Sequence, residues 1–361
     1  MSKRGRVLVA MSGGVDSSVA AVMLHEQGYE VIGLTMKTWD YASSGSSSKE
    51  TGCCSLDSIN DARALAVQYG FPHYILDIRD EFTGSVIDNF VEEYIAGRTP
   101  NPCVLCNTHI KWEALLKRAN HLDCEFIATG HYANVREEAG RYIISKGKDT
   151  HKDQSYVLWG VSQENLSRTR FPLGNFSKPE IRQMALDMGQ RELAEKSESY
   201  EICFVPDNDY RAFLRHQIPD LDEKVGKGNF VLQNGSIVGQ HQGYPYYTIG
   251  QRKGLGVALG KPMFVIEIIP DTNTVVLGEQ HELQRSHARV RNVNMIKYAR
   301  LEAPMEAVTK VRYKDAGMLS HITQEGTHVQ VDFHHAVQGI APGQSAVFYE
   351  GNDLLGGGFL C

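Results

Sequence analysis

The sequence contains no run that approaches the roughly 18 consecutive apolar residues needed by a membrane-spanning helix. Its first residues lead directly into a short apolar segment, Arg6–Ala10, which leaves no room for a secretion signal. Internal repeats and coiled-coil heptads are absent as well. We therefore expect a globular, cytoplasmic protein with no membrane partner.

Cysteine is scarce, and its seven copies are an odd number in a chain of 361 residues without a secretion signal. This usage argues against a disulfide framework and favours reduced thiols, some of them reactive. The length predicts two to three domains. A hydrophobic content of 42% and a charged content of 22% are typical of a globular protein.

The net charge of −6 gives no general support for a nucleic-acid partner, but the charge is unevenly distributed. Residues 284–314 contain eight Lys or Arg residues against two Glu residues. A basic segment on an acidic protein is compatible with local binding of phosphates, and equally with a solvated charged face.

The most informative motif follows the first apolar segment and lacks the lysine of a GxxxxGK[ST] phosphate loop. It reads Ser-Gly-Gly-Val-Asp-Ser-Ser and leads into the helix-forming residues Ser17–Gln27. A strand-to-helix turn with two glycines lets the backbone approach a ligand, and free N–H groups at the helix start favour a phosphate. The motif resembles the pyrophosphate-binding loop of the ATP pyrophosphatase (PP-loop) family, which splits ATP between its α and β phosphates.

Strands and helices alternate from residue 6 to residue 131, which predicts a doubly wound parallel sheet with helices on both faces. Ligands bind such sheets beyond the carboxyl ends of the strands, where Met36 and Gly130 also lie. The strands are expected at Arg6–Ala10, Glu30–Met36, His73–Asp77 and Phe126–Thr129, and the helices at Ser17–Gln27, Ser58–Tyr69, Glu81–Ala96 and Thr108–Asn120.

A second motif, Gly-Arg-Thr-Pro-Asn-Pro-Cys-Val-Leu-Cys-Asn, contains Cys103 and Cys106. Two prolines predict a rigid loop, after which Cys106 and Asn107 open a helix. A thiol at a helix N-terminus has a lowered pKa, as a nucleophile requires. The Cys-x-x-Cys spacing leaves redox and metal-binding interpretations open.

The rest of the chain predicts further parts. Ser177 caps a helix over Gly174–Met188, and Cys203 stands alone among β-forming residues. Short strands dominate after about residue 207, which indicates a small barrel or sandwich at the C-terminal end. The Gly/Ser-rich segment Tyr41–Ser48 is either a lid or a surface insertion. We place the domains at 1–206, 207–280 and 281–361.

Seven strings, in order along the whole chain, resemble the tRNA-specific 2-thiouridylase family: SGGVDSS, GRTPNPCVLCN, ATGHYA, KDQSY, EICF, GQRKGLG and PGQSAVFY. The resemblance implies a PP-loop α/β domain, a small central domain and a C-terminal β-barrel-like domain. It also implies ATP- and Mg²⁺-dependent 2-thiolation of the wobble uridine in tRNAs for Lys, Glu and Gln. The sulfur would come from an upstream persulfide donor, such as a cysteine desulfurase or a sulfur-relay protein.

The resemblance assigns Cys106 as the nucleophile and Cys203 as the persulfide carrier. The nucleotide site would comprise Ala10, Met11, Ser12, Gly13, Gly14, Val15, Asp16, Ser17, Met36 and Gly130. The tRNA contacts would comprise Asn101, Pro102, Cys103, His131, Lys152, Asp153, Gln154, Arg312, Tyr313 and Gln344.

One departure from the family pattern leaves alternatives open, because many relatives have Asp where this chain has Cys103. Cys103 either substitutes for that group or joins Cys106 and Cys203 in a three-thiolate site for an iron–sulfur cluster. Two rival functions are a PP-loop ligase acting on a small molecule and a non-catalytic RNA-binding protein. The first leaves the basic segment unexplained, and the second has no use for the phosphate loop.

Overall fold

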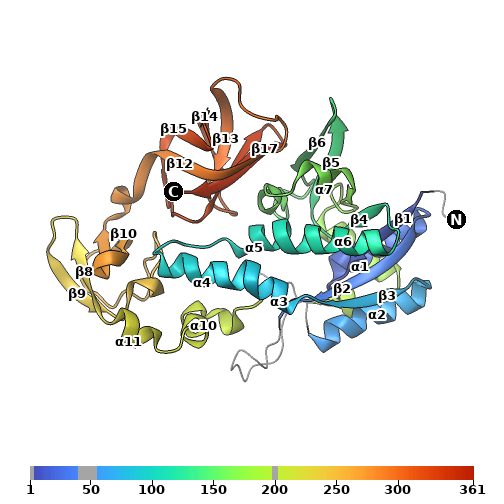
Figure 1. Cartoon of the computed structure of the whole chain (residues 1–361), viewed down its shortest axis with the longest axis horizontal. Coiled ribbons are helices and arrows are strands. Elements are labelled where there is room, and N and C mark those ends of the chain that lie inside the picture. The colour runs from blue at the N-terminus through green and yellow to red at the C-terminus, as the bar shows by residue number, and fades with distance from the viewer. Residues whose placement is uncertain (1–3, 40–54, 197–201) are drawn as a thin grey trace. The chain divides into compact units, whose positions relative to one another are not determined.

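The computed structural model describes residues 4–39, 55–196 and 202–361 (Figure 1). The chain forms two compact units, each assembled from separated segments. The first unit comprises Met1–Val86, Cys103–Asn208 and Asn352–Leu354, and the second comprises Ile87–Pro102, Asp209–Gly351 and Leu355–Cys361. The three domain boundaries expected from the sequence stay a prediction.

A five-stranded parallel sheet with the order β3-β2-β1-β4-β7 forms the centre of the first unit. This arrangement confirms the predicted doubly wound sheet. The strand order reverses between β1 and β4, so the carboxyl ends of these two strands flank the position where such sheets bind ligands. The strands are β1 (Arg6–Ala10), β2 (Glu30–Lys37), β3 (His73–Asp77), β4 (Phe126–Ala128) and β7 (Thr169–Arg170).

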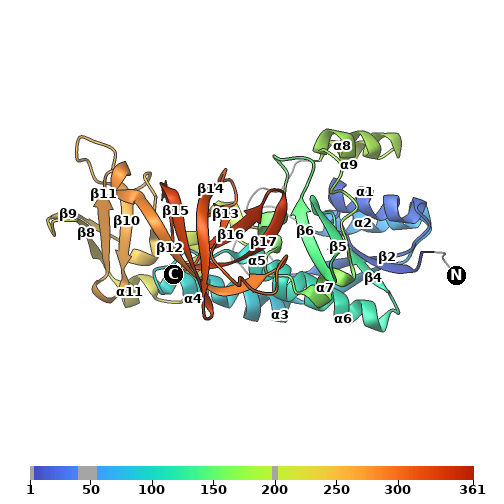
Figure 2. The same ribbon diagram turned by 90° about the horizontal axis from the view of Figure 1, so that it is seen from above.

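Helices cover both faces of this sheet (Figure 2). On one face, α1 (Val15–Glu26) and α2 (Leu56–Tyr69) pack Val22 and Leu65 against Val7 and neighbouring apolar residues of β1. Alternate residues of a strand point to opposite faces, so fully buried Val7, Leu8 and Val9 indicate that both faces are covered.

Two long helical stretches of the sequence contain a π-helical turn, which the prediction of continuous helices missed. The first runs through α3 (Arg79–Phe82), the π-helical η2 (Thr83–Ile87) and α4 (Asp88–Ile95). The second runs through α5 (Pro102–Leu105), the π-helical η3 (Cys106–Trp112) and α6 (Glu113–His121). This second stretch begins six residues before the start predicted at Thr108.

An antiparallel hairpin, β5 (Ala133–Glu138) with β6 (Arg141–Lys146), was not predicted. It is followed by η4 (Ser155–Leu158), α7 (Gln163–Ser167), α8 (Lys178–Asp187) and α9 (Arg191–Glu195). The prediction of a capped helix at α8 is confirmed, because Ser177 and Glu180 form a reciprocal capping box.

The second unit contains a four-stranded sheet of order β10-β11-β8-β9. Its strands β10 and β11 form an antiparallel hairpin, with Asn273 in the left-handed conformation at the turn. The elements are α10 (Tyr210–Gln217), α11 (Leu221–Val225), β8 (Gly228–Leu232), β9 (Ile237–His241), β10 (Phe264–Ile269) and β11 (Thr274–Gly278). The 3₁₀ turns are η5 (Pro206–Asn208), which belongs to the first unit, and η6 (Tyr244–Tyr246), η7 (Pro270–Thr272) and η8 (Gln280–Leu283).

Six antiparallel strands close into a barrel, in the order β12-β15-β14-β13-β16-β17 with β17 pairing back to β12 (Figure 1). Val290, Val331 and Phe348 are among the buried residues of its core. The predicted C-terminal barrel is therefore confirmed. The strands are β12 (Gln284–Met295), β13 (Met305–Lys310), β14 (Met318–Glu325), β15 (His328–Gln338), β16 (Ser345–Glu350) and β17 (Asp353–Leu360).

In the described ranges, no helix combines the length and the apolar character required to cross a membrane. The Gly/Ser-rich segment Tyr41–Ser48, for which the sequence left a lid and a surface insertion open, lies outside the described residues, as do Cys53 and Cys54.

Candidate functional site: a phosphate-binding turn and three cysteines

The Ser-Gly-Gly motif connects the carboxyl end of β1 to α1, as the sequence predicted. The Ser12 backbone N–H donates to Ser17 Oγ at 3.0 Å, and Ser17 Oγ donates to the Gly14 carbonyl at 3.2 Å. Gly13 has a φ of 65°, and a Cβ atom there would lie 2.0 Å from the Ser58 carbonyl oxygen. Only glycine fits this position, and the turn is held in one shape.

Gly130 follows β4 and lies against the start of α1. A Cβ atom at Gly130 would lie 2.8 Å from the Ser17 backbone nitrogen, so the backbone passes directly against the start of α1. Met36 is half-buried near the end of β2, the strand next to β1. The structure thus gathers the predicted nucleotide-site residues around the reversal point of the sheet.

The N-terminus of α1 offers features that suit a phosphate. Its N-cap is Gly14, which has no side chain to occupy the first N–H groups of the helix. Ser18 is 1% exposed, and its Oγ has no hydrogen-bond partner among the described residues. Unoccupied donors at a helix start, with the positive end of the helix dipole, favour an anionic group.

Asp16 in this turn is held by two residues that sequence reasoning missed. Lys178, at the start of α8, places its Nζ at 2.7 and 2.8 Å from the two carboxylate oxygens. The Tyr132 hydroxyl donates to Asp16 Oδ1 at 2.6 Å. The Lys178 side chain is only 9% exposed, so its charge depends on this partner. Tyr132 lies within the ATGHYA string, but no sequence pattern links Lys178 to residue 16.

A second lysine, Lys196, contacts the Ser12–Ser17 turn. Lys196 Nζ donates to the Gly13 carbonyl at 2.9 Å and pairs with Asp61 of α2 at 2.7 Å. The Ser12–Ser17 turn is therefore supported by Lys178 and Lys196, two lysines that are both distant from it in sequence.

The helix at the second motif begins at Pro102, which corrects the predicted position of Cys106. Cys106 is half-buried and lies at the fifth helical residue, whereas Cys103 is the second. The dipole effect is confined to the first turn, so the predicted activation of Cys106 by a helix N-terminus is wrong. Cys103 does lie in that turn; it is exposed, but desolvation by the surrounding protein raises the pKa of its thiol, and Lys111 opposes this shift.

Asn107, next to Cys106, is 2% exposed and fixes the start of η3. Its Nδ2 donates to the Val157 carbonyl at 3.0 Å. Its buried Oδ1 has no hydrogen-bond partner among the described residues. At the other end of η3, Trp112 Nε1 donates to Thr169 Oγ1 at 2.8 Å. These two anchors set the position of Cys106 on the helix.

Cys203 is exposed, whereas the adjacent Phe204 is buried. The Phe204 ring packs edge-on against Phe82, with ring centroids 5.6 Å apart. Phe82 ends α3, and α3 packs against η3, which begins at Cys106. The segment that carries Cys203 is therefore attached to the element beside Cys106.

His131 lies in an aromatic cluster and is 7% exposed. Its Nδ1 is 2.7 Å from Thr129 Oγ1, and its ring lies 5.7 Å from that of Trp112 and 6.2 Å from that of Phe171. Burial, with a smaller effect of Lys111, holds the His131 pKa well below its ordinary value. The predicted tRNA contact of this residue stays a prediction, and the structure gives it a packing role.

The segment 152–154 also has internal structural roles. Gln154 Oε1 accepts from the Tyr132 backbone N–H at 3.0 Å, and Asp153 Oδ1 accepts from the Gly147 N–H at 3.1 Å. Lys152 is half-buried. This segment thereby positions Tyr132, which in turn binds Asp16.

Two predicted tRNA contacts meet within the second unit. Gln344 Nε2 donates to the carbonyls of Pro100 at 2.8 Å and Thr99 at 3.3 Å, and Asn101 Nδ2 donates to Ser345 Oγ at 3.3 Å. These hydrogen bonds connect the loop before Pro102 to the barrel turn at Gln344. Pro102 itself is buried.

The basic segment is partly neutralised by its neighbours. Arg291, Lys297 and Arg300 form ion pairs with glutamates. Arg312 instead donates to the carbonyls of Gly339 and Ile249, and Tyr313 is 40% exposed. The exposed positive charge of this segment is smaller than its composition suggests.

Three family models match the chain: "tRNA methyl transferase HUP domain" over residues 5–207, "tRNA methyl transferase PRC-barrel domain" over residues 211–279, and "Aminomethyltransferase beta-barrel domain" over residues 285–360. Together with the described sheet, turn and barrel, these matches define the class as a HUP-domain protein with two further barrel-type domains. 

The tRNA-specific 2-thiouridylase MnmA of Amoebophilus asiaticus is 64% identical over 359 residues, with 99% of this chain and 96% of that protein covered. Its counterpart in Cytophaga hutchinsonii is 64% identical over 361 residues, with 100% and 98% covered. The chain therefore belongs to the tRNA-specific 2-thiouridylase family. Among solved structures, this chain has a weak similarity to a 4-thiouridine synthetase–RNA complex with bound ATP, with a TM-score of 0.38, 17% identity, and 60% of this chain and 51% of that chain covered.

Proposed function

We propose that this protein is a tRNA-uridine 2-sulfurtransferase that thiolates C2 of the wobble uridine in tRNAs for Lys, Glu and Gln. ATP would be split between its α and β phosphates, so that AMP activates the uracil C2 oxygen. Family membership supports the reaction class. The observation that carries the proposal is the phosphate-suited turn at the reversal point of the sheet, between β1 and α1.

The residues at this turn suit ATP as a substrate. Uncapped N–H groups of α1 would bind the pyrophosphate portion, and Gly130 leaves the approach to α1 without a side chain. Mg²⁺, when bound, would neutralise phosphate charge and help pyrophosphate to leave. Asp16 keeps a third of its side chain exposed while Lys178 and Tyr132 fix its orientation, so it can face a charged ligand without reorganising.

Sulfur transfer would use Cys203 as a persulfide carrier and Cys106 as the attacking thiolate. The Cys106 thiolate attacks the inner sulfur of the Cys203 persulfide, which forms a Cys106–Cys203 disulfide and releases hydrosulfide. Hydrosulfide then attacks C2 of the activated uracil, and AMP leaves with the former C2 oxygen. An external dithiol reduces the disulfide, and an upstream persulfide donor reloads Cys203. The packing of Phe204 on Phe82 supports a Cys203 segment close to the element that holds Cys106.

The tRNA would be bound by Asn101, Pro102, Cys103, His131, Lys152, Asp153, Gln154, Arg312, Tyr313 and Gln344. Of these, Cys103, Arg312 and Tyr313 are exposed, which supports direct contact with RNA. Gln344 and Asn101 stabilise a loop, so we propose that they shape the entrance for the base. A wobble base is unpaired in its loop, so its extrusion into a site costs little. A cytoplasmic location follows from this substrate.

Incubation of the protein with unmodified tRNA, ATP and a persulfide donor tests the proposal, with nucleosides and nucleotides analysed together. We expect 2-thiouridine, AMP and pyrophosphate in equal amounts. Cys106→Ser should abolish 2-thiouridine, whereas Cys361→Ser, which removes another exposed thiol, should leave it unchanged. Undiminished product from Cys106→Ser would overturn its assignment as nucleophile.

The same assay separates the alternatives. Strict dependence on iron and sulfide, with loss of product from Cys103→Ser, would favour a three-thiolate cluster on Cys103, Cys106 and Cys203. AMP formation that is indifferent to tRNA but requires an added small molecule would favour a ligase.

A further inference from the structure

A row of exposed polar side chains crosses the outside of the barrel. In the strand registers, Glu306 on β13 pairs with His321 on β14, His321 pairs with Asp332 on β15, and Asp332 pairs with His287 on β12. Residues directly opposite one another in antiparallel strands project from the same face of the sheet. His334 stands two residues after Asp332 on β15 and so shares this face.

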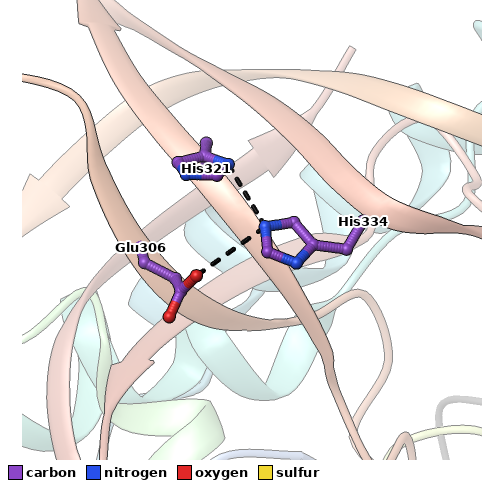
Figure 3. Close-up of side chains that lie close together, drawn as sticks. All are labelled: Glu306, His321 and His334. Atoms are coloured by element: carbon purple, nitrogen blue, oxygen red, sulfur yellow. Dashed lines mark hydrogen bonds and ion pairs between the residues drawn. The ribbon is translucent and has the colours of Figure 1, made fainter.

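Three members of this row converge on one point (Figure 3). His321 Nδ1 lies 3.2 Å from His334 Nε2, and His334 Nε2 lies 3.8 Å from Glu306 Oε2. One ligand atom from each residue lies within 4.8 Å of the other two. The two imidazole rings are 4.9 Å apart with an interplanar angle of 33°, so their nitrogens meet without ring stacking.

We propose that Glu306, His321 and His334 form a binding site for a divalent transition metal of the zinc type. Two imidazole nitrogens and one carboxylate oxygen are ligands that suit Zn²⁺, Co²⁺ or Ni²⁺, whereas Mg²⁺ and Ca²⁺ prefer oxygen alone. Zn–N bonds of about 2.0–2.1 Å in a tetrahedron separate neighbouring ligand atoms by roughly 3.3–3.4 Å. The nitrogen pair already has nearly this separation, and the carboxylate must approach His334 by about half an ångström and also move closer to His321, which its exposed side chain permits.

The site leaves a fourth position open to water or to a further ligand. Asp332, opposite His321 in the register, accepts a hydrogen bond from Gln330 at 3.4 Å and pairs with His287 at 3.1 Å, so it is engaged outside the three-residue set. None of the three ligands takes part in the thiolation proposed above, so the metal-site proposal does not depend on it.

Zinc titration of the full-length protein tests the site, after removal of metals by a chelator and of the chelator by dialysis. Calorimetry should show one Zn²⁺ equivalent that the double variant His321→Ala/His334→Ala loses. Glu306→Gln, which keeps the side-chain shape, should weaken that equivalent by about tenfold or more. His335→Ala removes a neighbouring exposed histidine outside the set and should bind as the unchanged protein does.

Co²⁺ absorption separates this site from the cysteines, because thiolate ligands add intense sulfur-to-metal charge-transfer bands and imidazoles do not. We expect the double variant to lose the ligand-field absorption of the imidazole-bound Co²⁺ and to keep any charge-transfer band of thiolate-bound Co²⁺. Unchanged circular dichroism in both variants establishes that the fold is intact, as expected for exposed side chains. Equal Zn²⁺ stoichiometry and affinity in the unchanged protein, the double variant and Glu306→Gln would overturn the proposal.

Discussion

Gly130→Ala tests whether the close approach of β4 to α1 shapes the nucleotide site. The added Cβ would lie 2.8 Å from the Ser17 nitrogen and 2.9 Å from the Asp16 carbonyl carbon. Ordinary contacts begin at 3.4 Å, so the first turn of α1 must move by about 0.6 Å. Overpacking of this kind costs about 1–3 kcal/mol. If that cost falls on the ATP-bound arrangement, the KM for ATP rises by roughly 5- to 150-fold.

The assay is AMP formation at saturating tRNA over a range of ATP concentrations. Gly84→Ala is the matched control, because a Cβ at Gly84 meets no atom within 4 Å and its backbone is helical. This control should leave the KM for ATP unchanged. A Gly130→Ala protein whose KM for ATP stays within about twofold of the parent would refute the reasoning, since the clash involves backbone atoms that cannot turn aside.

Three further predictions concern the supporting residues. Lys178→Met should lower the rate of AMP formation by about tenfold or more, because Asp16 loses its nearest cation and hydrogen bonds to a charged group contribute about 1.5–3 kcal/mol. The control Lys148→Met breaks an exposed ion pair with Glu180 and should change this rate by less than about twofold. Burial holds the pKa of His131 low in the folded protein, so below the ordinary pKa of 6.5 the unfolded chain binds one proton more, and the free energy of unfolding should fall by up to about 1.4 kcal/mol per pH unit. Thermal melting at pH 7.0 and 5.5 should therefore show a smaller loss of stability for His131→Phe than for the parent protein. An equal loss in both proteins would contradict this. Gln344→Ala frees two loop carbonyls and should raise the KM for tRNA while leaving that for ATP unchanged in steady-state kinetics.

Local signals in the sequence predicted the first unit well. Short runs of strand-forming residues predicted β1 and β3 at their observed bounds, and Ser177 predicted the start of α8. The π-helical turns were not predictable from periodicity, since they interrupt it by a single residue. The hairpin β5–β6 was missed because charged residues at 136–138 and 141 hide its alternation, and half of β5 is exposed.

The candidate site was predictable where it depends on adjacent residues and unpredictable where it depends on tertiary contact. The turn from Ser12 to Ser17 was visible because all its members are consecutive. The pairing of Lys178 with Asp16 spans 162 residues and has no local signature. The expected helix N-terminus at Cys106 was wrong because two prolines suggested a loop, although Pro102 itself fits the first turn of a helix.

The π-helical turn between Cys106 and Trp112 constrains how this motif can change in evolution. A π-helical turn accommodates one residue more than an α-helical turn, and one residue of an α-helix corresponds to a rotation of about 100°. Trp112 is fixed by Thr169 at one end, so deleting the one extra residue would return this turn to α-helical geometry and keep the thiol on the same face of the helix, whereas deleting a second residue would turn the thiol by about 100° around the helix axis. In any relative, the number of residues between this cysteine and this tryptophan is therefore as informative as their identities, because a gap of one residue keeps the orientation of the thiol and a gap of two changes it.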